Sequence, residues 1–121
     1  MADIARFCAG DHALLAPYGG DTGIVDAELA ALNRRRRIRV TVPDIGSLGP
    51  AVACSPLLAT LPASAARRVA ATHGLLLASP PVALPPLRPF LVWRARVHTT
   101  PDEVWFREQL LAHLSPPADE G

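Results

Sequence analysis

Asp44, Ser47 and the four histidines are the side chains with which this sequence could carry out catalysis. An Asp, a Ser and a His can form a hydrolase triad, in which the His accepts the proton of the attacking Ser hydroxyl. However, no Gly-x-Ser-x-Gly elbow surrounds Ser47, and the histidines lack the spacings that helical zinc sites use. The sequence therefore predicts a protein that is not an enzyme and that has no catalytic residues, metal ion or cofactor.

The isolated histidines and the two tryptophans have simple structural explanations. His12 begins an apolar segment and is expected to pack inside the protein rather than to bind a ligand. His73 and His98 lie near a helix end and before a helix cap, where surface or capping roles suffice. Trp93 and Trp105 could stack on an aromatic ligand, but their apolar neighbours favour packing against each other in a core.

Two further motifs could bind phosphate. The run from Arg34 to Arg37 could contact an anion, although a solvated turn between a helix and a strand is favoured. The loop from Tyr18 to Asp21 contains two glycines but lacks both the Gly-Lys-Ser/Thr ending and the Gly-x-Gly-x-x-Gly spacing. We therefore expect it to be a turn that lines a ligand cleft, and we expect no nucleic-acid site.

Apolar runs and breaker residues place the elements that would position these loops. The expected order begins with a strand at 12–16, a helix from Asp21 to Asn33, a strand at 38–42, a loop at 44–49, a short helix finishing over 50–55, a strand at 57–61 and a helix from Pro62 to Gly74. It continues with an apolar segment at 75–77, a proline-rich connection, a strand at 90–95 and a helix opened by Thr100, Pro101 and Glu103.

Strands that alternate with helices predict an α/β fold with a mainly parallel sheet flanked by helices. In such a sheet ligands bind beyond the carboxyl ends of the strands. These ends are followed by the loops Pro17 to Asp21 and Pro43 to Ser47. The sequence therefore predicts a ligand site between the two loops.

The composition is that of an ordinary globular domain. The chain has 121 residues, 50% hydrophobic, and a net charge of +1, so one domain is expected and a broad attraction to nucleic acid is not. Cys8 and Cys54 are isolated thiols, as in reducing compartments. The N-terminus does not resemble a secretory signal and the apolar runs are too short to span a bilayer, so a cytoplasmic protein without membrane contact is predicted.

Four blocks of the sequence carry a resemblance to a known family. These blocks are Phe7 to Asp26, Arg37 to Asp44, Ala53 to Pro62 and Phe90 to Arg94. Together they resemble the effector-binding domain of LysR-type transcriptional regulators, in the branch that includes nodulation and aromatic-degradation regulators. The resemblance covers residues 4 to 114, and the order and spacing of the blocks make it specific.

The resemblance implies a two-lobed effector domain with the type II periplasmic-binding-protein fold and a small effector in the cleft. By analogy, residues 12–84 supply the second lobe, 85–90 the crossover, and 90–114 the returning strand and last helix of the first lobe, with a disordered tail at 115–121. The first lobe would then be incomplete and the helix-turn-helix missing, so this is a truncated single domain. An apolar face would be left uncovered, which favours self-association.

The same resemblance implies the site and the partners. The residues expected to line the cleft are Pro17, Gly19, Pro43, Asp44 and Ile45, with Asp44 in a place where this branch usually has His. The implied function is a dimerising domain that senses a small effector, such as an aromatic or organic acid, and that makes no direct DNA contact. The alternative is a stand-alone interaction module, or a non-functional remnant, that pairs with a full-length regulator.

Overall fold

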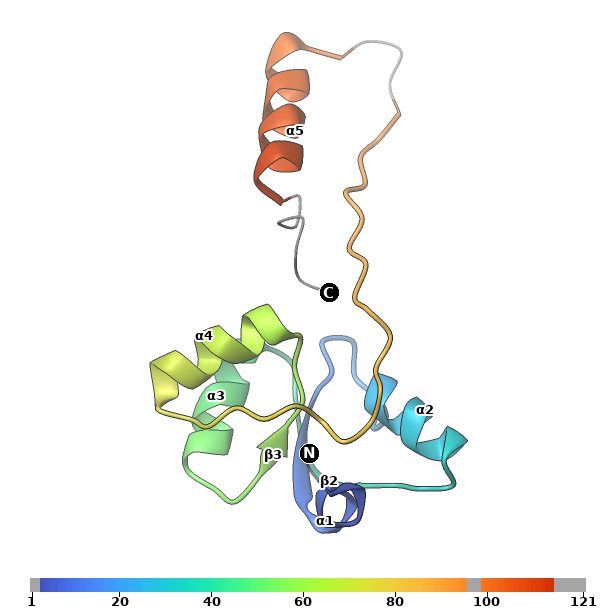
Figure 1. The fold of residues 1–121 in the computed structure, drawn as a ribbon. Coiled ribbons are helices and arrows are strands. Elements are labelled where there is room, and N and C mark those ends of the chain that lie inside the picture. The colour runs from blue at the N-terminus through green and yellow to red at the C-terminus, as the bar shows by residue number, and fades with distance from the viewer. Residues whose placement is uncertain (1–2, 96–98, 115–121) are drawn as a thin grey trace. The chain divides into compact units, whose positions relative to one another are not determined.

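The computed structural model describes residues 3–95 and 99–114, and the chain divides into two compact units (Figure 1). Unit 1 is Met1–Leu87 and unit 2 is Arg88–Gly121. The elements of unit 1 are α1 (Ile4–Ala9), β1 (Asp11–Leu15), α2 (Ile24–Ala31), β2 (Arg37–Val42), α3 (Ile45–Ala53), β3 (Leu58–Ala59) and α4 (Ala63–His73). Unit 2 contains α5 (Pro101–Leu114).

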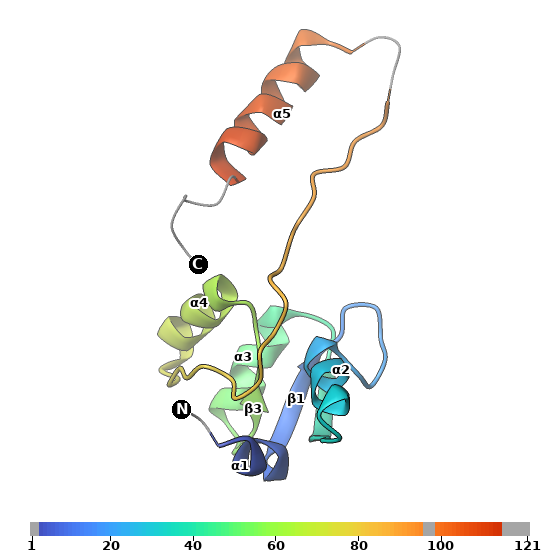
Figure 2. The ribbon, with the colours of Figure 1, turned by 45° about the vertical axis from the view of Figure 1, so that its right-hand side comes forward.

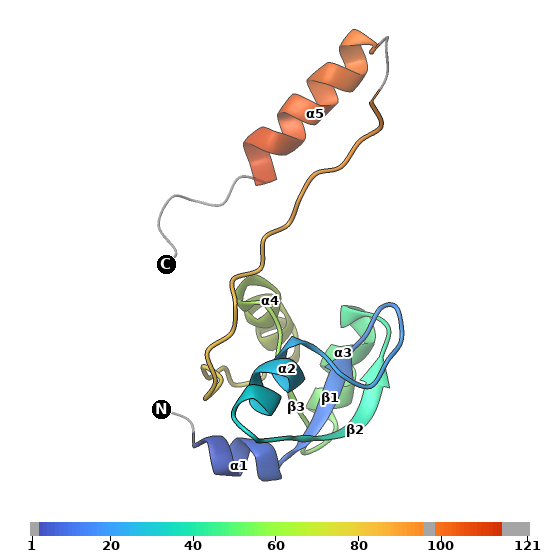
Figure 3. The ribbon, with the colours of Figure 1, turned by 90° about the vertical axis from the view of Figure 1, so that its right-hand side faces the viewer.

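The sheet of unit 1 is open and has three strands in the order β2-β1-β3. Both pairings are parallel, which confirms the predicted parallel sheet. Figures 2 and 3 place α2 on one face of the sheet and α3 with α4 on the other. This arrangement follows from the strand order, because right-handed crossovers that leave a central strand in opposite directions put their helices on opposite faces.

The core of unit 1 forms where α1, α2 and a late segment of the chain meet. Val25 and Leu29 of α2 are buried against Val82, and Phe7 of α1 packs on the same cluster. The sequence analysis missed α1, which is only six residues long. Its start is fixed by Asp3, whose side chain accepts a hydrogen bond of 2.8 Å from the amide of Ala5.

Two predicted boundaries are wrong for the same reason, namely a capping interaction closer to the helix than expected. The residue that caps α2 is Gly23 and not Asp21, because Asp26 reaches back to accept a 2.7 Å hydrogen bond from the amide of Gly23. The predicted loop at 44–49 is instead the first half of α3, since the Asp44 side chain accepts a hydrogen bond from the amide of Ser47. Pro50 therefore lies inside this helix.

The helix α4 and its ends agree with the prediction. Pro62 is its N-cap residue, and Gly74 ends it in the left-handed conformation with a φ of 66°. The capping box of α5 is also confirmed, because the Thr100 amide donates to the Glu103 carboxylate over 3.1 Å and the Glu103 amide donates to the Thr100 hydroxyl over 3.3 Å.

The predicted strand at 90–95 and the apolar segment at 75–77 form no strand in the described part of the chain. A strand exists only where another strand pairs with its backbone, and neither segment has such a partner among the described residues. Trp93 and Trp105 are 55% and 62% exposed, so their predicted core packing is wrong. Trp93 instead lies under the guanidinium of Arg107, 4.7 Å from the ring centre.

The close packing of α3 on α4 gives a testable prediction at Gly49. A Cβ atom at this buried position would lie 2.4 Å from Nε2 of His73. Gly49→Ala is therefore expected to lower the free energy of unfolding by about 1–2 kcal/mol, because the ring must move out of a packed interface. In a His73→Ala background the same change should raise it by up to about 1 kcal/mol, because Ala forms helix better than Gly. Urea denaturation of the four proteins checks this, and additive effects would contradict it.

Candidate effector site

The carboxyl ends of β1 and β2 lie side by side, because Leu15 pairs with Val42 in parallel register. The pairing extends one residue further, where the amide of Ala16 donates to the carbonyl of Val42 over 2.9 Å. The chain then leaves β1 at Pro17 and β2 at Pro43. The sheet therefore brings the two loops that were predicted to form the site to the same edge.

The loop after β1 is open and exposes its backbone. Its turn is closed by a 3.1 Å hydrogen bond from the amide of Gly19 to the carbonyl of Ala16. Gly19 and Gly20 have φ values of 81° and 103°, which residues with side chains adopt only under strain. No atom lies within 4 Å of where a Cβ of either glycine would be, and Tyr18 is fully exposed. A ligand could thus approach the backbone of this loop closely.

The loop after β2 leads directly into α3. Both carboxylate oxygens of Asp44 accept hydrogen bonds from the Ser47 hydroxyl, over 3.1 and 3.0 Å, and one also accepts from the Ser47 amide over 2.8 Å. Asp44 therefore caps the helix and its charge already faces the amide dipoles of the first turn. Next to it, Ile45 is 41% exposed and offers an apolar surface.

A third loop reaches the same edge, and the sequence analysis did not include it in the site. Because β3 is parallel to β1, the residues from Thr60 to Pro62 follow its carboxyl end. The predicted strand at 57–61 and the Pro62 helix start were the signals from which it could have been found. The edge is therefore formed by three loops, each of which leads into a helix.

These three helix starts differ in charge. The first turn of α2 carries Asp26, and α3 is capped by Asp44. In contrast, α4 has no acidic residue in its first turn and no side chain that caps it. The partial positive charge of a helix N-terminus favours anions, so α4 is the start that leaves this preference unmet by its own side chains.

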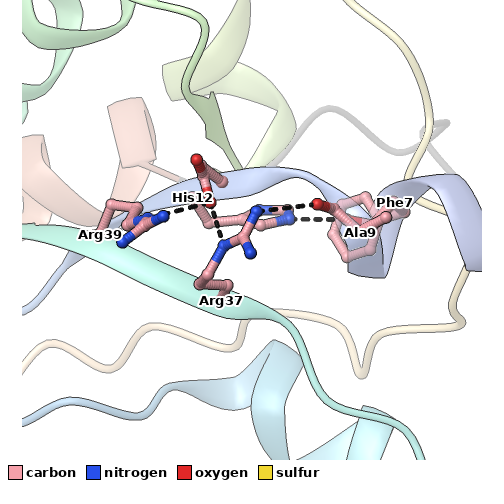
Figure 4. A network of polar contacts seen from close by, with 6 residues as sticks. Phe7, Ala9, His12, Arg37 and Arg39 are labelled. Carbon is pink, nitrogen blue, oxygen red and sulfur yellow. Dashed lines mark hydrogen bonds and ion pairs between the residues drawn. The ribbon is translucent and has the colours of Figure 1, made fainter.

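The opposite edge of the sheet holds a network of ion pairs (Figure 4). Asp11 accepts hydrogen bonds from Arg37 and from Arg39, the latter over 3.1 Å, and Arg37 also donates to the carbonyl of Ala9. The hydrogen bond from Arg37 is the largest influence that lowers the pKa of Asp11. The Arg37 and Arg39 side chains are more than half exposed, so this network orders the surface more than it stabilises the fold.

The expectation that the run from Arg34 to Arg37 is a solvated turn is wrong for Arg36. Its side chain is only 2% exposed and binds both oxygens of Asp26, over 2.8 and 3.0 Å. Burial by itself would raise the pKa of Asp26, but the hydrogen bonds from Arg36 and from the Gly23 amide outweigh it and lower the pKa. This buried ion pair ties α2 to the start of β2.

His12 is fully buried, as predicted for a packed residue. Its Nε2 lies 2.8 Å from the carbonyl oxygen of Phe7, and its ring meets the Phe7 ring edge to face at 4.6 Å (Figure 4). Burial is the main reason that the pKa of His12 is lowered, so the ring is neutral in the folded protein near neutral pH. His12 thus joins α1 to the sheet and lies away from the edge of the three loops.

The lowered pKa of His12 predicts a loss of stability at mildly acidic pH. Below the ordinary value of 6.5 the unfolded chain takes up a proton that the folded chain does not, so the free energy of unfolding falls as the pH falls. One such group gives a slope of at most about 1.4 kcal/mol per pH unit. Urea denaturation between pH 7.5 and 5 should show a shallower slope for His12→Gln. His113→Gln should retain the wild-type slope, and equal slopes for all three proteins would contradict the prediction.

Among the described residues, no three His, Cys, Asp or Glu side chains gather as metal ligands. No helix in this part of the chain has the length and the apolar character needed to cross a membrane. His98 and the segment 115–121 lie outside the described residues.

Comparisons with known proteins identify the relatives of this fold. No family model matches the chain. It is 34% identical over 110 residues to the HTH-type transcriptional regulator SyrM 1 of Sinorhizobium fredii, and 30% identical over 105 residues to the HTH-type transcriptional activator NahR of Pseudomonas putida. Among solved structures it matches the regulatory domain of MexT, a transcriptional activator in Pseudomonas aeruginosa, with 29% identity and a TM-score of 0.70.

The chain is a homologue of the LysR-type transcriptional regulators. This confirms the resemblance found in the sequence, and the match to a regulatory domain agrees with an effector-binding domain. These LysR relatives are regulators and not enzymes, in agreement with the sequence analysis. The alignments cover 90% and 87% of the chain but only 32% and 35% of SyrM 1 and NahR, so the chain spans about a third of these relatives. It covers 93% of itself and 56% of the MexT regulatory domain.

Proposed function

We propose that the chain is the effector-binding part of a LysR-type regulator and that it binds a small organic acid at the carboxyl edge of its parallel sheet. The observation that carries the proposal is the parallel register of Leu15 and Val42, since it places the Pro17 and Pro43 loops together at the edge where open α/β sheets bind ligands. The proposed lining residues are Pro17, Gly19, Pro43, Asp44 and Ile45.

The charges at this edge support an acidic effector. A carboxylate would be repelled by Asp44 and Asp26 at the starts of α3 and α2, but α4 begins without an acidic residue. The open backbone at Gly19 and the exposed Ile45 side chain add a close backbone approach and an apolar surface. We therefore place the carboxylate of the effector at the start of α4 and its apolar part near Ile45.

The proposal extends to the whole regulator by analogy. Residues 12–84 would form the second lobe of a type II periplasmic-binding-protein fold, 85–90 its crossover, and 90–114 a part of the first lobe. The chain would act in the cytoplasm as a homodimer and would leave DNA contact to a helix-turn-helix that it does not contain. The comparisons do not favour the alternative of a stand-alone interaction module.

A titration followed by two-dimensional amide NMR tests the site. Benzoate and short aliphatic carboxylates, added to the full chain, should shift the amide signals of residues 18–20, 45–47 and 63–65 and leave those of α1 unchanged. If no acid in this series moves any amide at this edge, the sensing proposal fails. Shifts confined to the exposed Arg37 and Arg39 would indicate unspecific anion contact and would also contradict it.

Two glycines offer a matched pair of variants for the same test. Gly19 and Gly74 both have a positive φ, and a Cβ at either would meet no atom within 4 Å, so both alanine variants carry similar strain. Only Gly19 lies at the proposed site, because Gly74 ends α4 at the opposite end of that helix. Gly19→Ala should weaken binding about fivefold, the equivalent of ~1 kcal/mol, and Gly74→Ala should leave it unchanged. Equal losses would show that strain anywhere in the unit has this effect.

A further inference from the structure

The helix α5 of unit 2 is apolar on more than one side. The side toward the extended segment encloses a hollow of about 300 Å³, which is lined by Leu91, Val92, Trp93, Arg94, Thr99, Glu103, Phe106, Arg107 and Leu110. Trp105 and Leu111 belong to a different side of the helix and are 62% and 48% exposed. A helix that is apolar on several sides is normally buried on several sides. The outer side of α5 is therefore a candidate interaction surface.

The outer side has a sequence that is complementary to itself. The midpoint of α5, which runs from Pro101 to Leu114, falls between Arg107 and Glu108. If a second α5 lies antiparallel with its midpoint at the same place, Arg107 of each copy faces Glu108 of the other, and Val104 faces Leu111. Each such contact occurs twice, as in any interface with two-fold symmetry. The charges and the apolar residues thus match a second copy of the same helix.

The pairing of opposite charges cannot be explained within one helix. Residues at neighbouring positions point about 100° apart and do not face each other, so Arg107 and Glu108 do not form a pair along the same α5. Arg107 lies over Trp93, which holds its aliphatic stem near the edge of the outer side. The guanidinium is therefore placed beside the surface that a second helix would contact.

We propose that two copies of this chain associate through the outer sides of their α5 helices, antiparallel and centred between Arg107 and Glu108. This interface does not depend on the effector site, which belongs to unit 1. It buries Trp105 and Leu111, which are large side chains of the kinds that dominate protein interfaces or cores. The charge pairs at its centre set the register and exclude the parallel arrangement, in which Arg107 would face Arg107.

The test uses charge variants of the full chain in sedimentation velocity, with the wild-type chain expected to dimerise. Arg107→Glu creates two glutamates at the centre, and Glu108→Arg creates two arginines, so each variant alone should dimerise at least about tenfold more weakly. In an equimolar mixture every central contact joins a Glu to an Arg, so mixed dimers should form with restored affinity. Circular dichroism of each variant shows that α5 is retained.

An exposed leucine in unit 1 provides the control. Leu76 is 99% exposed, and Leu76→Glu removes as large an apolar surface as Leu111→Glu does. Leu76→Glu should leave the dimer intact, whereas Leu111→Glu should abolish it. The proposal is overturned if the wild-type chain is monomeric, if the mixture of charge variants behaves as the sum of its parts, or if Leu76→Glu and Leu111→Glu have equal effects.

Discussion

Replacing Asp26 with Asn is expected to lower the free energy of unfolding by about 3–5 kcal/mol at pH 7. The Arg36 guanidinium is 2% exposed and donates two hydrogen bonds to this carboxylate, so the variant leaves a buried positive charge without its counter-charge. The change also weakens the hydrogen bond from the Gly23 amide that starts α2. A loss of this size is a large part of the stability of a small domain.

The matched control is the same substitution at Asp11. Asp11 also receives two arginines, but their side chains are 56% and 58% exposed, and exposed ion pairs contribute little. Asp11→Asn should therefore cost less than about 1 kcal/mol. Urea denaturation at pH 7, followed by circular dichroism, measures both. If both variants lose the same amount, burial of Arg36 is not what makes the Asp26 pair important.

Truncating Leu29 to Ala is expected to lower the free energy of unfolding by about 2–5 kcal/mol. Leu29 is completely buried in the cluster with Val25 and Val82, so the variant loses apolar burial and leaves a cavity. The cluster joins α2 to residues near the end of unit 1, and few side chains are available to fill the space. The loss should therefore lie in the upper part of the range.

Leu32→Ala is the control because it makes the same change one turn later. Leu32 is 54% exposed, and its truncation should cost less than about 1 kcal/mol. Thermal denaturation of the two variants and the wild type would show this difference as a much larger fall in Tm for Leu29→Ala. Similar shifts would mean that the core of unit 1 does not lie where the structure places it.

The parallel sheet and the meeting of its loops could be predicted from sequence, because both follow from local patterns. The apolar run at 12–16 and the alternation at 38–42 fix strands of the right length, and Pro62 and Gly74 mark the ends of α4. Parallel strands then require their carboxyl ends to meet. The site loops at Pro17 and Pro43 follow from this step alone.

The features that were missed depend on contacts between distant residues. Nothing local separates Arg36 from its neighbours in the basic run, since its burial comes from Asp26 on another element. The start of α3 depends on whether the Asp44 side chain turns toward Ser47, which the sequence permits but does not require. An apolar, β-branched run such as 90–95 looks like a strand, yet its state depends on a pairing partner elsewhere.

The cluster around Leu29 has a consequence for how the chain folds during synthesis. Ile4 and Phe7 from the first helix pack with Val82 and Leu84 from the last segment of unit 1. Contacts so far apart in sequence form late, because the whole intervening chain must be closed into a loop. On the ribosome, α1 and α2 must wait with their apolar sides open until residue 84 has left the exit tunnel. Chaperones and proteases would therefore find unit 1 vulnerable until its last few residues emerge.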